Sequence, residues 1–212
     1  MSKNASSADN QQGSFHQKLM DNPSETTRRA PFSDRIIKAY LLGALHDGTL
    51  NKGKRFRFSQ KGNEWLKLLQ TLFKKIGYNS WLYREGKKRD VYVLETLADF
   101  LEIRFNPNNL IRKEEKNTYV KGFFDAEGGI PHERKSRFYI QLSQNNRNKL
   151  RKIKIILRNS SINTGKIHNP SSSINPKYWR MYISADSQWD FIRKIGSWHP
   201  RKLAIIRKRV MI

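Results

Sequence analysis

The stretch Tyr119-Val-Lys-Gly-Phe-Phe-Asp-Ala-Glu-Gly-Gly-Ile130 is an apolar helical run that ends in two carboxylates and then two glycines. Upstream, Ala39-Tyr-Leu-Leu-Gly-Ala-Leu-His-Asp-Gly-Thr-Leu50 has the same pattern: an apolar run with an internal glycine, an acid near its end and a glycine directly after the acid. A glycine that follows the last periodic residue is a helix stop signal. Two such stretches predict two matching half-domains, each built on one of these helices.

The acids of these stretches stand at unusual positions. Asp47 and Glu127 fall in the last turn of their helices, where the negative end of the helix dipole disfavours an anion by about 0.3 to 1 kcal/mol. Close packing of the two helices would bring these carboxylates side by side, where like charges repel. The arrangement therefore predicts a hard divalent cation, which prefers carboxylate oxygens. Small residues spaced four apart would permit such packing: Ala39 and Gly43 in the first helix, and Thr118, Gly122 and Ala126 in the second.

The composition indicates a polyanionic partner. The 212 residues carry a net charge of +24 and a pI near 10.4, which favours nucleic acid first and a membrane surface second. No long apolar run or signal-peptide pattern is seen, so we expect no membrane-spanning or exported segment. The chain has no cysteine, which excludes disulfides and suits a reducing compartment. We expect a cytoplasmic, nucleoid-associated location, or an organellar matrix in a eukaryote.

The order of predicted elements is the same after each of the two helices. Residues 1–32 are too polar to bury a core and are predicted to be a flexible tail. In the first half, residues 33–105, periodicity predicts a helix ending at Asp47-Gly48, followed by strands at 49–51 and 54–60 across a Lys52-Gly53 turn. A helix over 63–76 comes next. Strands at 81–84 and 90–94 across the turn 85–89 and a helix over 96–103 complete this half.

A linker at 106–111 precedes the second half, residues 112–199. There we predict a helix ending at Glu127-Gly128, strands at 129–133 and 137–144 across a basic turn, a helix over 146–158, strands at 164–168 and 178–184 around a loop at 169–176, and a helix over 186–197. The basic segment 200–212 is expected to add phosphate contacts or to dock as a helix.

The two halves can be aligned by their first hairpins, because the pair Ser59-Gln60 recurs as Ser143-Gln144. In this register Phe58 corresponds to Leu142, and Phe56 to Ile140. One face of each sheet is therefore core, and the other carries long hydrogen-bonding side chains, as a sheet laid against nucleic acid requires.

Two helices that end in acid-glycine, each followed by these strands and helices, resemble the LAGLIDADG homing endonucleases in their single-chain form with two fused repeats. The resemblance covers residues 33–199, and Gly122-Phe-Phe-Asp-Ala-Glu-Gly128 matches the family's motif. It implies an α+β fold of two pseudo-symmetric αββαββα halves, each with a four-stranded antiparallel sheet, packed through the two motif helices. It also implies an intron-encoded monomer that binds a long asymmetric site in double-stranded DNA and hydrolyses both strands across the minor groove, leaving 3′ overhangs.

The first motif departs from the family pattern. Asp47 is the fourth residue after Gly43, whereas Glu127 is the fifth after Gly122, so aligning the glycines places Gly48 opposite Glu127. We take Asp47 as the first-site acid, because a tightened last turn can absorb one residue. In the alternative, Asp47-Gly48 is only a helix stop and one strand is cut poorly or not at all.

The resemblance also implies the roles of particular residues. Asp47 and Glu127 would hold Mg²⁺, with Mn²⁺ as a substitute, and Gly48 and Ala126 complete the predicted metal site. Lys61 stands where the family commonly has an assisting lysine, while Asn145 takes that place in the second half, so the two sites are expected to be unequal. On spacing alone, Lys61 fits a phosphate contact equally well.

Side chains that read or contact DNA are expected on the outer faces of the sheets. Arginine can read guanine and glutamine can read adenine in the major groove, although many such contacts go to phosphate instead. The predicted set is Arg55, Arg57, Arg84 and Arg89 in the first half, and Arg137, Tyr139, Gln141, Lys166 and Arg180 in the second.

Three other functions fit parts of the sequence. His46-Asp47 resembles the centre of an HD phosphohydrolase motif, but the remaining histidines lack ligand spacing. A LAGLIDADG-type maturase that assists intron splicing, or another non-catalytic RNA-binding protein, fits the charge, with intron RNA as its partner; a purely binding protein, however, gains nothing from paired acids beside phosphates. A transcription regulator on the same fold would usually carry an added helix-turn-helix domain.

Overall fold

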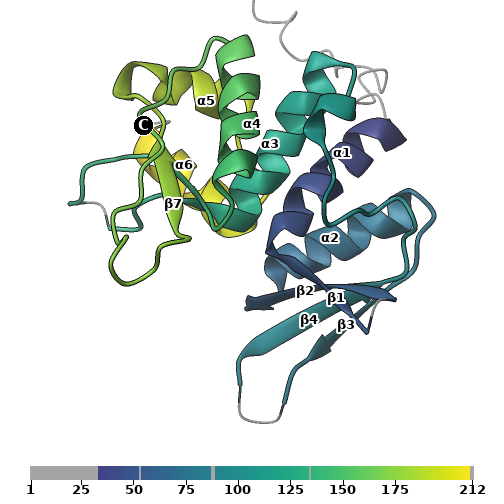
Figure 1. Ribbon diagram of the computed structural model, residues 1–212. Coiled ribbons are helices and arrows are strands. Elements are labelled where there is room, and N and C mark those ends of the chain that lie inside the picture. The colour runs from purple at the N-terminus through teal and green to yellow at the C-terminus, as the bar shows by residue number, and fades with distance from the viewer. Residues whose placement is uncertain (1–32, 53, 87–88, 134, 211–212) are drawn as a thin grey trace, which may run out of the picture. The chain divides into compact units, whose positions relative to one another are not determined.

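The computed structural model describes residues 33–210 apart from 53, 87–88 and 134 (Figure 1). The predicted N-terminal tail lies outside these residues, as do Gly53, Lys87, Lys88 and Arg134 of the predicted turns. The chain from Ser33 onward forms one compact unit. Across the described positions, no helix is both long enough and apolar enough to cross a membrane.

The first repeat has the predicted sheet. Its elements are α1 (Asp34–Ala44), the 3₁₀ turn η2 (Leu45–Asp47), β1 (Gly48–Asn51), β2 (Arg55–Lys61), α2 (Glu64–Lys75), β3 (Ser80–Arg84) and β4 (Val91–Thr96). The four strands are antiparallel in the order β1-β2-β4-β3.

The helix predicted over 96–103 is wrong. The chain leaves β4 in separate turns, with Leu101 N–H donating to the carbonyl of Ala98 and Phe105 N–H donating to that of Glu102. Thr96 Oγ1 donates to the carbonyl of Asn79 and accepts from Ala98 N–H, which ends the strand and turns the chain. The apolar spacing that suggested a helix is instead the burial of Ala98 and Leu101.

The second repeat has a smaller sheet than the sequence predicted. Its elements are η3 (Pro107–Asn109), α3 (Lys113–Glu127), β5 (Gly128–Gly129), β6 (Gln141–Gln144), α4 (Arg147–Asn159), β7 (Trp179–Tyr182), η4 (Ala185–Ser187) and α5 (Gln188–Lys194), and the basic C-terminal segment forms α6 (Pro200–Val210). The three strands are ordered β5-β6-β7, where four were expected.

Two sets of contacts explain why the second sheet has shorter strands than the sequence predicted. The segment 164–168, predicted as the fourth strand, meets β7 and its flank only in isolated bridges, Thr164 with Ile183 and His168 with Arg180. Between β5 and β6, Arg209 of α6 donates to the carbonyls of Glu133 and Ser136. A side chain therefore takes backbone groups that a neighbouring strand would have used.

Each sheet packs one face on a helix. Phe58 and Leu94 of the first sheet are fully buried with Phe73 of α2, and Leu142 and Met181 of the second are buried with residues of α4. The ladder pairs Gly48 with Phe58 and Gly128 with Leu142. The predicted correspondence of Phe58 with Leu142 is thereby confirmed.

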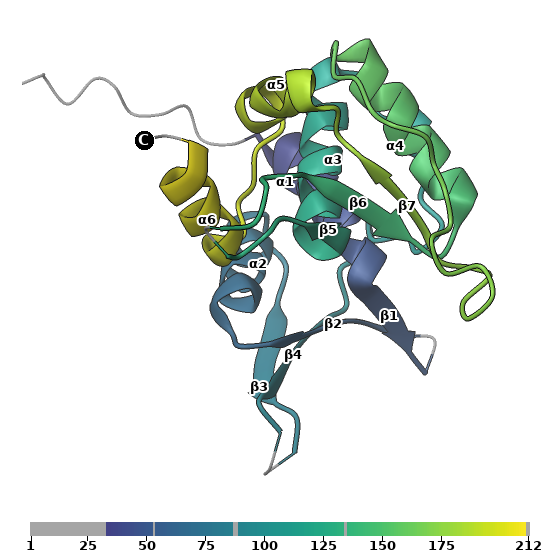
Figure 2. The same ribbon diagram turned by 90° about the vertical axis from the view of Figure 1, so that its left-hand side faces the viewer.

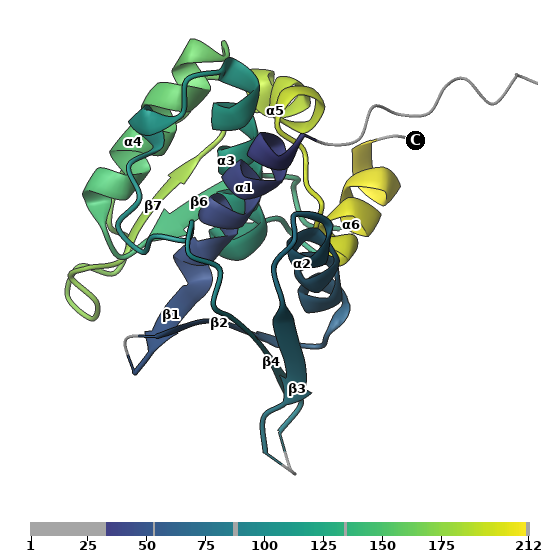
Figure 3. The same cartoon turned by 90° about the vertical axis from the view of Figure 1, so that its right-hand side faces the viewer.

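The two repeats meet where α1 and α3 lie side by side (Figures 1 and 3). A β-carbon added at Gly43 would clash with the carbonyl of Tyr119, and one added at Gly122 would clash with the carbonyl of Tyr40. The contacts are reciprocal, so Gly43 and Gly122 are equivalent positions of the two helices. Both glycines are required because the backbones touch.

We predict that Gly122→Ala destabilises the protein by about 3 kcal/mol or more, because the methyl group must displace backbone rather than a flexible side chain. Urea denaturation of purified protein measures the loss. Gly165→Ala is the matched control, since its methyl group would meet no heavy atom nearer than 3.7 Å, and its effect should stay within about 1 kcal/mol. Equal stability of Gly122→Ala and wild type would contradict the close approach.

Candidate active site

The ends of the two motif helices place Asp47 and Glu127 at the same point of their repeats. Each acid directly precedes the first residue of its strand, Gly48 in β1 and Gly128 in β5. Counted from the equivalent glycines of the two helices, Asp47 comes one position earlier than Glu127. The 3₁₀ turn Leu45–Asp47 accounts for the difference, since it advances farther per residue than an α-helix. The tightened last turn expected from the sequence is present.

His46 is the counterpart of Asp125, the motif aspartate of the second repeat, because each is the third residue after its helix glycine. Tyr40 of α1 donates its hydroxyl to Asp125 Oδ2 at 2.6 Å. Reciprocally, the hydroxyl of Tyr119 in α3 lies 2.6 Å from His46 Nε2. Burial lowers the pKa of His46 to about 3, so the ring is neutral and shares a hydrogen bond with the tyrosine hydroxyl. His46 therefore contributes to the packing of the two helices and does not act as a residue of an HD phosphohydrolase site.

Asp47 and Glu127 lie close enough for their charges to interact. Burial raises the pKa of Glu127 to about 7, and the negative charge of Asp47 raises it as well. Desolvation also raises the pKa of Asp47 to about 6, an effect that the positive charge of Lys202 opposes. Asp47 remains accessible to solvent and Glu127 is half-buried. A carboxylate pair of this kind favours a bound proton or cation.

The two acids have different neighbours. Gln144 Nε2 donates to Glu127 Oε1 at 3.0 Å, and Ser143 Oγ donates to the Glu127 carbonyl at 3.0 Å. Gln60 is the equivalent of Gln144 in the first repeat, yet its amide lies 3.2 Å from His199 Nε2. The second acid is therefore oriented by its own sheet, whereas the matching amide of the first sheet is engaged by the C-terminal segment.

The donor set fits a cation held by few protein ligands. Within the described part of the chain, no group of three or more His, Cys, Asp or Glu side chains could hold a metal. Mg²⁺ commonly takes one or two carboxylates and completes its coordination with phosphate and water oxygens, and Asp47 and Glu127 supply two carboxylates. Gly48 and Ala126 are not equivalent to each other: Gly48 follows its acid, and Ala126 precedes its acid with no counterpart in the first repeat.

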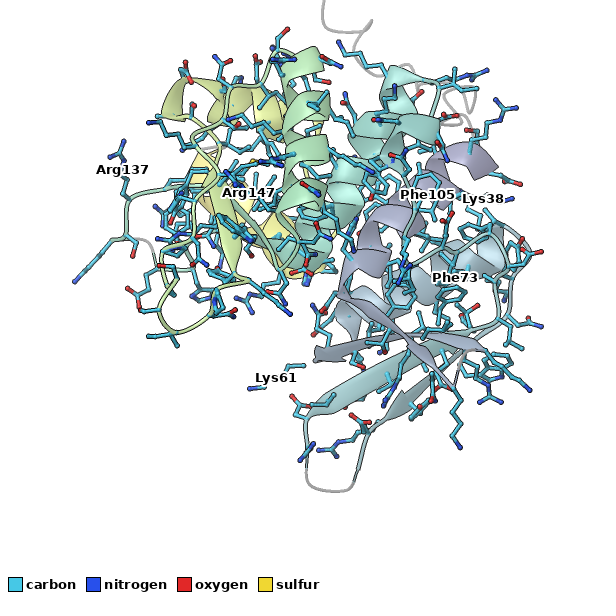
Figure 4. All side chains as sticks on the ribbon, viewed as in Figure 1. Lys38, Lys61, Phe73, Phe105, Arg137 and Arg147 are labelled. Carbon is cyan, nitrogen blue, oxygen red and sulfur yellow. The ribbon has the colours of Figure 1, made fainter. Side chains whose placement is uncertain are left out.

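Lys61 is the last residue of β2 and is exposed to solvent (Figure 4). In the register of the two hairpins, Asn145 takes its place and is also exposed. The structure therefore has a cationic side chain at this point of the first repeat and a neutral amide in the second.

The outer face of the first sheet carries Arg55 and Arg57, both held by carboxylates. Arg55 Nη1 lies 3.2 Å from Glu95 Oε2, and Arg57 is paired with Glu85. Arg57 Nε is buried and has no hydrogen-bond partner among the described groups. The acids hold both guanidinium groups on the face, which limits the entropy lost when a ligand binds.

Arg84 lies on the opposite face from Arg55. The ladder pairs Leu82 with the buried Leu94 and Arg84 with Tyr92, which places Arg84 on the side of the sheet that faces α2. Trp81 and Tyr83, which alternate with these residues, occupy the outer face and are exposed. Arg84 Nε donates to the carbonyl of Arg89 at 3.0 Å.

The outer face of the second sheet combines a cation with aromatic rings. The ladder pairs Gln141 with Tyr182 and Ser143 with Arg180. The Arg180 guanidinium lies 5.4 Å from the ring of Tyr182, and Tyr139 meets that ring edge-on at 5.7 Å. Such a surface suits phosphate and base contacts. The other predicted contact residues are exposed: Lys166, Arg89 and Arg137 (Figure 4).

Sequence reasoning missed Gln144, Trp81, Tyr83 and Lys202. Gln144 could have been found from the register of the hairpins, because Gln60 matches it. The alternation of Trp81 and Tyr83 with Leu82 carried a signal for the outer face. Lys202 had no local signal, since its contacts are with α3, far away in the chain.

Solved structures share this fold. The structure of I-DmoI in complex with DNA and Mn aligns with a TM-score of 0.57 and 21% identity over 77% of this chain and 97% of that chain. Full-length DUF199/WhiA from Thermatoga maritima aligns with a TM-score of 0.62 and 20% identity over 85% of this chain and 62% of that chain. The N-terminal LAGLIDADG domain of DUF199/WhiA aligns with a TM-score of 0.62 and 18% identity over 79% of this chain and 85% of that chain. At these identities the likeness establishes the fold.

Residues 114–196 match a family model described as a LAGLIDADG-like domain. The second repeat therefore matches the LAGLIDADG-like domain. The reciprocal contacts of α1 and α3 show that α1 holds the same position in the first repeat as α3 does in the second. A search of curated proteins finds no match. The α+β class and the packing through the two motif helices are confirmed, with the second sheet reduced to three strands.

We predict that Glu127→Gln stabilises the protein at pH 8 when metal is chelated. The pKa of Glu127 rises from its ordinary 4.5 to about 7, so the folded state binds more protons than the unfolded state between these values. Stability contributed by the carboxyl is therefore lost as pH rises from about 4.5 to about 7. The neutral amide avoids this loss, with a gain of about 1 to 2 kcal/mol after allowance for partial exposure.

Urea denaturation in EDTA at pH 4.5 and pH 8 measures this difference. The gain from Glu127→Gln should be present at pH 8 and vanish at pH 4.5, and Glu102→Gln, at an exposed position, should show neither effect. A gain of the same size at both pH values would disprove the electrostatic cause.

Proposed function

We propose that this chain is a site-specific endonuclease of double-stranded DNA. The observation that carries the proposal is the meeting of Asp47 and Glu127 at the ends of the two helices that join the repeats. The net charge of +24 supplies attraction to a nucleic acid backbone. The fold shared with I-DmoI, whose structure is a complex with DNA, supports DNA as the partner.

The two sheets would lie in the major groove on either side of the cleavage point. Arg55 and Arg57 are held where a guanidinium could read guanine, and Gln141 could read adenine. Glu85, which holds Arg57, can also accept from cytosine. The different sizes of the two sheets fit a long asymmetric target. Because both repeats are in one chain, the functional unit is a monomer.

The motif acids would hold Mg²⁺ or Mn²⁺ against the scissile phosphates. When bound, the cation lowers the pKa of a water nucleophile and stabilises the leaving oxygen. Gln144 keeps Glu127 Oε1 oriented, and Lys61 offers a positive charge near the first-repeat site only. Each repeat would cut one strand across the minor groove, giving 3′ overhangs, with the two strands cut at unequal rates.

We predict that the wild-type protein cuts one duplex selected from a randomised DNA library in Mg²⁺, and that Asp47→Asn or Glu127→Gln lowers double-strand cleavage at least 100-fold. Loss of an active-site carboxylate removes the protein's hold on the cation, and catalytic groups typically contribute factors of this size. Sequencing of cleaved ends identifies the site and the overhang. EDTA should abolish cleavage by the wild type.

Asp186→Asn, an exposed acid in η4, is the matched control and should cut as the wild type does. If only Glu127→Gln abolishes double-strand cleavage, Asp47 serves only as a helix stop. A protein that cuts no duplex but binds structured RNA tightly would favour the RNA maturase function instead.

We also predict that 10 mM Mg²⁺ raises the melting temperature of the wild type and leaves that of the Asp47→Asn, Glu127→Gln double variant unchanged. A cation that binds only the folded protein stabilises it by mass action. Differential scanning fluorimetry measures the shift without DNA. Equal shifts in both proteins would place the cation elsewhere.

A further inference from the structure

The C-terminal helix α6 is anchored to the second motif helix through one buried carboxylate. Asp125 accepts hydrogen bonds from Tyr40 at 2.6 Å, from the hydroxyl of Ser197, and from the backbone N–H groups of Trp198 and His199 at 2.8 and 3.0 Å. Tyr40 belongs to α1, and the other three donors directly precede α6. Asp125 therefore joins the first repeat, the second repeat and the C-terminal helix.

This anchor places Lys202, in the first turn of α6, against the last turn of α3 (Figure 2). Lys202 Nζ donates to the carbonyl oxygens of Phe124 and Asp125, at 2.9 Å for the latter, and lies 4.6 Å from the centre of the Phe124 ring. A cation at the C-terminal end of a helix interacts favourably with its carbonyls and its dipole. Lys202 therefore holds the turn that carries Glu127.

A cavity of about 210 Å³ adjoins this contact and is shared by both repeats and the C-terminal segment. Its polar lining includes Gln60 of β2, the backbone of Gly128 and Gly129, and the side chains of His199, Arg201 and Lys202. The hydrogen-bonding pair Gln60 and His199 closes one side of it. The C-terminal helix thus borders the same space as β5, the strand that follows Glu127.

We propose that α6 is part of the nuclease site and that Lys202 is a positioning residue for it, an inference that rests on the proposed endonuclease function. Lys202 acts through the last turn of α3: it keeps Glu127 beside Asp47 while the DNA backbone is bound.

A lysine that only capped α3 would predict a different outcome. Its removal would lower the stability of the fold, yet the protein that remained folded and bound to DNA would cut at the normal rate. A positioning residue instead changes the rate of cleavage within the bound complex and leaves the affinity for DNA unchanged.

The test uses the full chain and the duplex that the wild type selects. Lys202→Met should lower the single-turnover cleavage rate in Mg²⁺ at least 10-fold, with the dissociation constant in Ca²⁺ within twofold of wild type; a complex of I-DmoI with DNA was crystallised with Ca. Lys202→Arg, which keeps the charge and the donors, should recover the rate to within threefold. Lys208→Met, at an exposed position of α6, is the matched control and should cut as the wild type does.

Three results would overturn the proposal. One is cleavage of the bound duplex by Lys202→Met within twofold of the wild-type rate, and another is equal loss in Lys208→Met. The third is a wild type that cuts no duplex, which removes the endonuclease function itself and is visible without any Lys202 variant. If Lys202→Met fails to fold by circular dichroism, Lys202→Gln, also uncharged and too short to reach the carbonyls, is judged by the same criteria.

Discussion

The close approach of α1 and α3 is the constraint on which the rest of the structure depends. Backbone contact at Gly43 and Gly122 places two helices of different repeats against each other, so that both helices end at the same point. Asp47 and Glu127 stand at those ends. Their proximity is a consequence of helix packing. Burial raises the pKa of both groups, and the charge of Asp47 raises the pKa of Glu127 further. Such a pair is retained at a cost in stability, as is common at functional sites.

The motif aspartate Asp125 and the motif acid Glu127 have separate tasks, although only Ala126 lies between them. Asp125 points into the protein, where four donors from α1 and from the segment 197–199 surround it. Glu127 stays half-buried beside Asp47. His46 replaces the aspartate in the first repeat and makes a hydrogen bond with a tyrosine of the opposite helix. Among the described residues, the segment before α6 hydrogen-bonds to Asp125 rather than to its counterpart His46, so the pseudo-symmetry is broken at this point.

The arginine side chains on the outer faces of the two sheets are held in different ways. In the first sheet, Arg55 and Arg57 are fixed by carboxylates of the same sheet. In the second, Arg180 packs against Tyr182, and fewer strands are available. The second sheet has fewer strands partly because of α6, since Arg209 of this helix donates hydrogen bonds to carbonyls between β5 and β6. The same helix that contacts the last turn of α3 through Lys202 also limits the sheet beside it.

Local patterns predicted the two motif helices, the register of the first hairpins and the tightened turn before Asp47. These features follow from periodicity, glycine positions and the alternation of side chains along a strand. Long-range contacts instead decided that residues 96–103 are not helical, that 164–168 forms no full strand, that Asp47 and Glu127 lie near each other, and that Lys202 contacts the end of α3. Each of these depends on a partner far away in the chain, and no local pattern records which distant group will satisfy a backbone carbonyl, a carboxylate or an ammonium.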